Sequence, residues 1–252
     1  MKQNGYTSFA GFYDRLTSDV DYAGAAAYLL GLFRLHGGRT DTLLDLACGS
    51  GSLSLELARQ GADIIGVDGS EDMLALAQEK AAAAGLPLLF LHQDMRALDL
   101  YGTVSGAVCT LDSLNHILRT QELEEILRRL HLFVDPEGLL IFDANTPYKH
   151  REVLADNDFV YEKPDFTCIW RNRFLPRTGE TDMLLDFFVE EADGRYLRLT
   201  DRVRERAYSK KTWERLLSGS GFHLLAVYGE GTAHAPSPDG QRWVFVARNT
   251  PH

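Results

Sequence analysis

The chain has 252 residues, of which 45% are hydrophobic and 25% charged, and its formal net charge is -10. This length predicts one sizeable domain, with or without a small insertion. The negative charge argues against a nucleic-acid backbone as the main ligand, because phosphate binding needs clustered Lys and Arg. Three widely spaced cysteines suggest neither a disulfide framework nor a zinc site. No apolar run approaches the roughly 18 residues of a membrane span, and the N-terminus lacks the apolar core of a signal peptide, so we expect a cytoplasmic protein.

The first part of the chain alternates helical patterns with short apolar runs. The first 36 residues are predicted to be helical, with Gly37 and Gly38 as a stop. Strands are then expected at Thr42–Ala47, Asp63–Val67, Leu88–His92, Gly106–Leu111 and Gly138–Asp143. Helices are expected between them, at about Ser52–Gln60, Glu71–Ala84 and Gln121–Phe133. This alternation implies a parallel sheet with helices on both faces.

The sequence pattern changes after Asn145. From Phe159 to Tyr208 no helical period appears. Three extended runs, "TCIWRNRFL", "TDMLLDFFVEE" and "RYLRLTDRVRERAY", are separated by "PRTG" and "ADG" turns. We therefore expect an antiparallel β insertion over residues 148–208, within an α/β domain formed by residues 1–147 and 209–252. The insertion is expected to cover the substrate or to form a dimer contact. A short helix capped by Ser209 and two consecutive strands, about His223–Tyr228 and Arg242–Arg248, complete the α/β domain.

The turn "DLACGSGS" joins the first of these strands to a helix. Gly49 and Gly51 let the backbone approach a ligand closely, and the helix N-terminus offers free N–H groups. The alternative is that the glycines only make a tight turn. Asp68, at the end of the next strand, can accept hydrogen bonds from both ribose hydroxyls of an adenosine, in a dinucleotide as well as in other cofactors. Asp45 suits a ligand's amine, and Asp94 can accept a hydrogen bond from an adenine amino group.

The segments "LLDLACGSGSLSLELA", "VDGSEDML", "LHQDMRAL" and "CTLDSLNHIL" resemble the successive motifs of class I S-adenosylmethionine-dependent methyltransferases. The leading "FYDRL" and the late β insertion are most similar to bacterial small-molecule enzymes, including amino-sugar N,N-dimethyltransferases. The resemblance implies a Rossmann-like seven-stranded, mostly parallel α/β sheet with a C-terminal antiparallel hairpin. It implies that S-adenosyl-L-methionine is the cofactor. The residues implied to bind it are Tyr13, Asp45, Ala47, Gly49, Gly51, Asp68, Gly69, Met73, Asp94, Met95 and Leu111. The family often has Gly where this chain has Ala47.

The methyl acceptor is expected beyond the carboxyl ends of the strands. Asp112, Asn115 and His116 follow the fourth strand, and Asn145 and Tyr148 follow the fifth. His116 is the candidate general base, since an unperturbed imidazole titrates near working pH. Its alternative is a hydrogen-bonded wall residue. Asp112 either orients a substrate amine or caps a turn. Tyr13 either closes the pocket and takes part in catalysis or is an ordinary core aromatic.

The insertion adds two sets of candidate residues. Trp170 and Arg173 are candidates for substrate binding. The row Arg198, Arg202, Arg204 and Arg206 shares one parity, so it projects from one face of a regular strand. These arginines either clamp an anionic substrate or form a solvated row paired with the acids of "EEADG".

We therefore expect a methyltransferase that transfers a methyl group by in-line displacement to nitrogen or oxygen of a small-molecule acceptor, without a metal. No nucleic-acid or membrane partner is expected, and the protein is expected to be a monomer or homodimer. The first alternative is a protein that binds S-adenosylmethionine without turnover. The second is an NAD(P)-dependent oxidoreductase, which is disfavoured because Ser54 stands where G-x-G-x-x-G has its third glycine.

Overall fold

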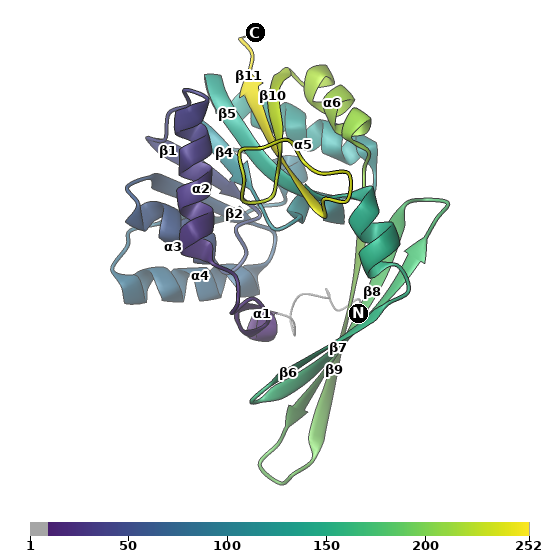
Figure 1. Ribbon diagram of the computed structural model, residues 1–252. Coiled ribbons are helices and arrows are strands. Elements are labelled where there is room, and N and C mark those ends of the chain that lie inside the picture. Colours follow the sequence, from purple (N-terminus) through teal and green to yellow (C-terminus); the bar gives the residue numbers. More distant parts are fainter. Residues whose placement is uncertain (1–9, 252) are drawn as a thin grey trace.

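The computed structural model describes residues 10–251 and contains two separate sheets (Figure 1). The larger sheet has seven strands in the order β10-β11-β5-β4-β1-β2-β3. Its strands are β1 (Thr42–Leu46), β2 (Asp63–Asp68), β3 (Leu89–His92), β4 (Val104–Cys109), β5 (Val134–Asn145), β10 (Phe222–Gly229) and β11 (Arg242–Asn249). Neighbouring strands among β1, β2, β3, β4 and β5 pair in parallel, whereas β11 pairs antiparallel with both β5 and β10. The expected Rossmann-like fold with its C-terminal hairpin is thus confirmed.

Helices cover both faces of this sheet. They are α2 (Tyr22–Leu35), α3 (Ser52–Arg59), α4 (Glu71–Ala84), α5 (Thr120–Phe133) and α6 (Lys210–Gly219). Adjacent strand residues point to opposite faces, so Leu43 packs in the cluster that holds α2 and α3, while Leu44 packs with α5 and α6. Among residues 10–251, none of the helices is long and apolar enough to cross a membrane.

The order of the strands positions the site. The chain moves outward from β1 in one direction through β2 and β3, and then returns to place β4 on the other side of β1. Ligands of open α/β sheets bind beyond the carboxyl ends of the strands at such a reversal. The turns that follow β1 and β4 therefore border the crevice, and short 3-10 turns follow β3 and β4, η1 (Met95–Ala97) and η2 (Ser113–His116).

The insertion forms the second sheet, which projects from the α/β domain as a long twisted ribbon (Figure 1). Its antiparallel strands are β6 (Asp158–Lys163), β7 (Phe166–Leu175), β8 (Glu180–Glu190) and β9 (Tyr196–Arg206). Three extended runs were expected, and β6 is the additional strand. One face of this sheet packs against Phe12 of α1 (Ala10–Leu16), whose ring stacks on Phe187 at 5.0 Å between centroids.

Three predicted elements differ from the structure by more than one residue. Strand β4 lies at Val104–Cys109, two residues before its predicted range Gly106–Leu111. The N-terminal helix is divided into α1 and α2, because α2 starts anew where Asp21 caps it through Gly24 N; residues 1–9 of that prediction lie outside the described residues. The strand expected to start at Gly138 begins at Val134. Val134 pairs with Val104 and Leu139 with Gly106, so the turn-like "DPEG" is an irregularity inside the ladder, with Glu137 in the left-handed region at φ 66°.

Candidate active site

The glycine turn after β1 is tightly wound. Ala47, Gly49 and Gly51 all have positive φ, at 60°, 54° and 74°. A left-handed conformation is costly for a residue with a Cβ, so Ala47 is strained here and a glycine would not be. The Asp68 carboxylate accepts hydrogen bonds from Gly49 N and Ser70 N, both at 2.8 Å, and so connects this turn to the end of β2.

Asp45 lies at the base of this turn and is almost completely buried. Its carboxyl accepts a hydrogen bond from Ser54 Oγ at 2.5 Å, and no ion pair with a cation is formed by it among residues 10–251. Burial raises the pKa of Asp45 to about 7, although the hydrogen bond from Ser54 lowers this pKa. A ligand ammonium beside Asp45 would offset this burial cost, as expected for the amine of a methionine group. Ser54, which replaces the third glycine of a dinucleotide motif, is thus a partner of Asp45.

Helix α1 covers the glycine turn. The Tyr13 ring lies 4.0 Å from the position that a Cβ on Gly49 would occupy, and burial raises the pKa of the Tyr13 hydroxyl. Lys80 Nζ holds α1 in place by donating to Asp14 Oδ2, Ser50 Oγ and Ser52 Oγ at 2.8 to 2.9 Å. The remaining cavity between Tyr13, Asp45, Ala47 and Leu111 measures about 30 Å³, which suffices for a few waters and not for a nucleoside. Tyr13 of α1 thus lines the same cavity as Asp45 and Leu111.

The other candidate cofactor residues surround the ends of β2 and β3. Gly69 is open: a Cβ there would meet only Gln93 O, at 3.9 Å. Met73 is buried in the first turn of α4, where its N–H donates to the Ser70 cap. Asp94 caps η1, beside Met95, and both of its oxygens accept from Arg96, whose hydrogen bonds lower the Asp94 pKa.

The turn after β4 is strained. Leu111 and Asp112 have φ of 54° and 52°, so two consecutive residues with side chains adopt the left-handed conformation. The Asp143 carboxylate holds this turn by accepting from Leu111 N at 2.9 Å and Asp112 N at 2.6 Å. Arg242 then donates to Asp143 at 3.0 Å and to Asp112 at 2.7 Å. Such stored strain is typical of functional sites.

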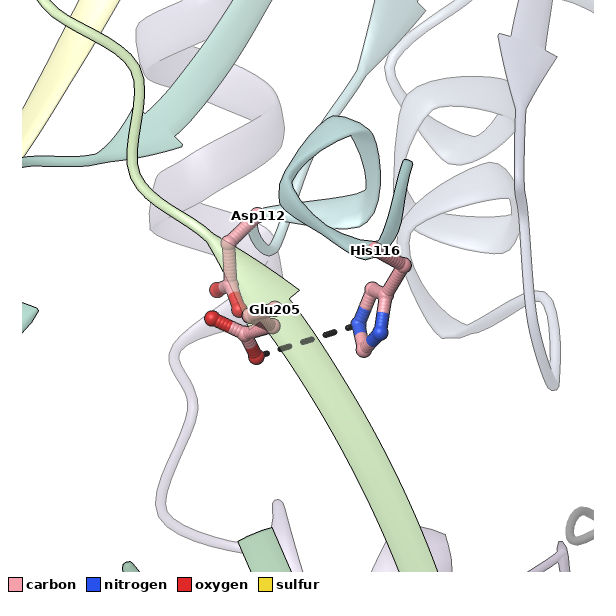
Figure 2. Close-up of side chains that lie close together, drawn as sticks. All are labelled: Asp112, His116 and Glu205. Carbon is pink, nitrogen blue, oxygen red and sulfur yellow. Dashed lines mark ion pairs between the residues drawn. The ribbon is translucent and has the colours of Figure 1, made fainter. Parts of the chain in front are cut away.

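Asp112, His116 and Glu205 converge beyond this turn (Figure 2). Their ligand atoms lie within 4.8 Å of one another, and His116 Nε2 is 3.9 Å from Glu205 Oε1. Burial raises the pKa of Asp112, but Arg242, Lys149 and His116 lower it more, to about 2, so this carboxylate is ionised. These residue types also bind divalent metals, and the sequence prediction of no metal stays a prediction.

The two asparagines expected to bind the substrate have different hydrogen-bond partners. Asn115 is fully buried, accepts from Asn145 N at 2.9 Å and donates to Arg206 O at 2.8 Å, so its amide joins η2 to β5 and β9. Asn145 donates to Glu205 at 3.1 Å and accepts from Lys149 at 2.9 Å. The geometry thus gives Asn115 a structural role and leaves Asn145 next to the acidic cluster. Tyr148 is half-buried, directly before the π-helical turn η3 (Lys149–Leu154).

The insertion residues divide between the two faces of its sheet. Trp170 lies on the same face as Glu205, but four ladder positions away, roughly 13 Å along the strand, where its indole N–H donates to Asn172. Arg173 stands beside Asp182 on the opposite, exposed face and is not brought to His116. Most of the arginine row lies there too. Arg198, Arg202 and Arg204 pair with Asp186, Asp182 and Glu180 of β8, so the expected pairing with "EEADG" is wrong. Arg206 donates to Leu118 O.

Comparisons with known proteins agree with this geometry. A family model described as a methyltransferase domain matches residues 43–138. The putative methyltransferase YqeM of Bacillus subtilis (strain 168) is 32% identical over 248 residues, 97% of both chains. The dTDP-3-amino-3,6-dideoxy-alpha-D-glucopyranose N,N-dimethyltransferase of Streptomyces fradiae is 34% identical over 207 residues, 81% of this chain and 78% of that one. An S-adenosylmethionine-dependent methyltransferase from Clostridium acetobutylicum ATCC 824 superposes with a TM-score of 0.88 and 28% identity, covering 98% of this chain and all of that one.

The chain therefore belongs to the class I S-adenosylmethionine-dependent methyltransferases. It is an enzyme of that class, and S-adenosylmethionine is its methyl donor. The polar groups present fit this donor, since Asp45 is a buried carboxylate without a cation and Gly69 leaves open space next to Asp68. Sequence reasoning missed Asp143, Arg242, Glu205, Lys149 and His150. Only Asp143, at the carboxyl end of a predicted strand, had a local signal.

Proposed function

We propose that the methyl acceptor is a small molecule that binds beside Asp112 and His116 and is methylated on nitrogen or oxygen by in-line displacement. The observation that carries this proposal is the convergence of Asp112, His116 and Glu205 at the carboxyl end of β4, next to Leu111 and the glycine turn. The N,N-dimethyltransferase of Streptomyces fradiae, which is similar over most of the chain, supports a small acceptor.

S-adenosylmethionine supplies an activated methyl group, so the chain's own residues need to align the acceptor and remove a proton. Holding the acceptor in line at about 3 Å contributes several kcal/mol to rate acceleration. His116 is partly exposed and can take a proton from the acceptor, while Asp112 stays ionised and can orient it. Asp45 and Asp68 bind the donor.

Substitution of His116 by Ala tests this assignment. If His116 is the base, turnover falls about 100-fold or more, and the affinity for S-adenosylhomocysteine, measured by calorimetry, stays within about twofold. His223→Ala, at the exposed residue of edge strand β10, is the matched control and should leave both values unchanged. Unchanged turnover in the His116 variant would return His116 to a structural role. Titration with NADH in the same experiment would show binding only if the cofactor assignment were wrong.

A further inference from the structure

Glu205 is carried to the site by the insertion, and its surroundings are unusual for a buried carboxylate. The side chain is almost fully buried on the inner face of β9. Within the described part of the chain its ion-pair contacts are two imidazoles, His150 Nε2 at 3.4 Å and His116 Nε2 at 3.9 Å, and no Lys or Arg. A buried carboxylate is costly unless a positive group and hydrogen bonds compensate it. Asn145 Nδ2, at 3.1 Å, provides one hydrogen bond.

His150 is a second and independent sign that this place is arranged for a ligand. Its ring is fully buried, its Nδ1 is 2.8 Å from Thr181 Oγ1, and its Nε2 has no hydrogen-bond partner. That Nε2 points at the Glu205 carboxylate. Thr181 stands directly opposite Glu205 in the β8–β9 ladder, so the same two strands position both the carboxylate and the imidazole behind it.

The charges of the cluster favour one kind of ligand. The three ligand atoms lie within 4.8 Å of one another, close enough for one small cation to contact all of them. An ammonium group has donors for three hydrogen bonds. The Arg242 guanidinium already binds Asp112 at 2.7 Å, so Glu205 is the carboxylate of the cluster that has no Lys or Arg partner among the described residues. A single carboxylate without a cationic side chain favours a singly charged ammonium over a divalent metal ion.

We propose that Glu205, together with Asp112 and His116, forms a subsite for the protonated amine of the acceptor, so that the insertion selects amines over alcohols. This inference rests on the proposed function and extends it to Glu205. One N–H proton passes from the ammonium to His116. The freed lone pair forms the nitrogen–carbon bond to the methyl group, while the carbon–sulfur bond breaks and its electron pair remains on sulfur. The product carries the positive charge that the sulfonium loses.

The test uses methylammonium chloride as the probe, with the full chain saturated with S-adenosylhomocysteine. The His116 ring proton signal, assigned with His116→Gln, is followed by NMR. We expect methylammonium to shift this signal at least tenfold more effectively in the wild type than in Glu205→Gln, and methanol to have no effect. Glu180→Gln, in the exposed ion pair with Arg204 on the other face of the insertion, is the matched control and should behave as wild type.

Three results would overturn the amine subsite: equal responses to methylammonium and methanol, an unchanged response in Glu205→Gln, or broadening by micromolar MnCl₂ without any response to methylammonium. Glu205→Asp keeps the charge and should recover part of the response, which separates loss of the carboxylate from misfolding. Binding of S-adenosylhomocysteine is measured by calorimetry on the same samples. Absence of S-adenosylhomocysteine binding would count against the proposed function. The methylammonium response of the cofactor-free chain would still show whether the amine subsite exists.

Discussion

The part of the site around the glycine turn and the part around His116 are built in different ways. The first is local: Asp45, Gly49 and Asp68 lie within one βαβ unit, where Gly49 N donates to Asp68 and Ser54 Oγ donates to Asp45. The second is assembled from distant segments, since Arg242 reaches Asp112 across 130 positions and Glu205 arrives on the insertion. A local unit can keep its ligand while the distant segments change. This division suits an enzyme class with one donor and many acceptors.

The acceptor part should therefore depend strongly on Asp143, the residue that joins its segments. Asp143→Ala removes the acceptor of two N–H groups in the strained turn and leaves the buried Arg242 with one partner fewer. We expect the free energy of unfolding, from urea denaturation, to fall by about 3 to 5 kcal/mol. Glu124→Ala removes an exposed ion pair between α5 and α6 and should cost no more than about 1 kcal/mol. Equal losses in both variants would show that Asp143 does not hold the turn.

In the donor part the largest effect is expected at Asp68. Asp68→Ala removes the acceptor for Gly49 N and Ser70 N as well as the expected ribose contacts. We expect the dissociation constant of S-adenosylhomocysteine, measured by calorimetry, to rise at least tenfold, about 1.4 kcal/mol or more. Asp63→Ala, at the exposed start of the same strand, is the control and should bind normally. Tight binding by the Asp68 variant would place the ribose elsewhere.

The burial of Asp45 predicts that donor binding depends on pH. Its pKa is about 7 without a ligand, above the usual value of about 3.9, so at pH 6 most of this carboxyl is protonated. If the ligand ammonium binds the ionised form, binding at pH 6 releases a proton. Affinity then falls by up to about tenfold per pH unit below 7 and stays constant just above it. Calorimetry in two buffers of different ionisation enthalpy measures the proton release.

Asp45→Asn is the control for this proton linkage. The amide cannot titrate, so its weaker binding should be the same at pH 6 and pH 8. A wild type whose heat of binding at pH 6 is independent of the buffer would contradict the linkage. The result bears on the donor part alone, because Asp45 lies beneath the glycine turn and away from Glu205.

The same difference explains what could be predicted from the sequence. Asp45, Gly49 and Asp68 stand at fixed positions in a strand–turn–helix–strand pattern, and each strand of the parallel sheet was found from its apolar run. Glu205 lies in a row of arginines, and only the pairing of β8 with β9 shows that it points inward while Arg204 points outward. The Asp112–Arg242 pair depends on β11 lying next to β5, which no local pattern encodes.

The missed strand β6 has a similar cause. Asp158–Lys163 is exposed at an edge, with Val160 60% accessible, so it lacks the buried apolar alternation that reveals a strand. It is defined by its pairing with β7. The division of the N-terminal helix had a local signal that was missed: Thr17–Asp21 has one apolar residue, Val20, and Asp21 is a favourable N-cap residue. The backbone turns there, and Tyr13 lies over Gly49.

The smallest effect is expected at Ala47, where the donor part departs from the common glycine. Its φ of 60° is unfavourable for alanine, so Ala47→Gly should raise the free energy of unfolding by about 1 kcal/mol, the strain relieved less the entropy that glycine loses. Ala82→Gly, on the exposed face of α4, is the same substitution in a helix and should lower it by about 1 kcal/mol. Urea denaturation of both variants measures the two values. Opposite signs would show that the strain lies in the glycine turn. A lower free energy of unfolding in both variants would show that Ala47 adopts its conformation without strain.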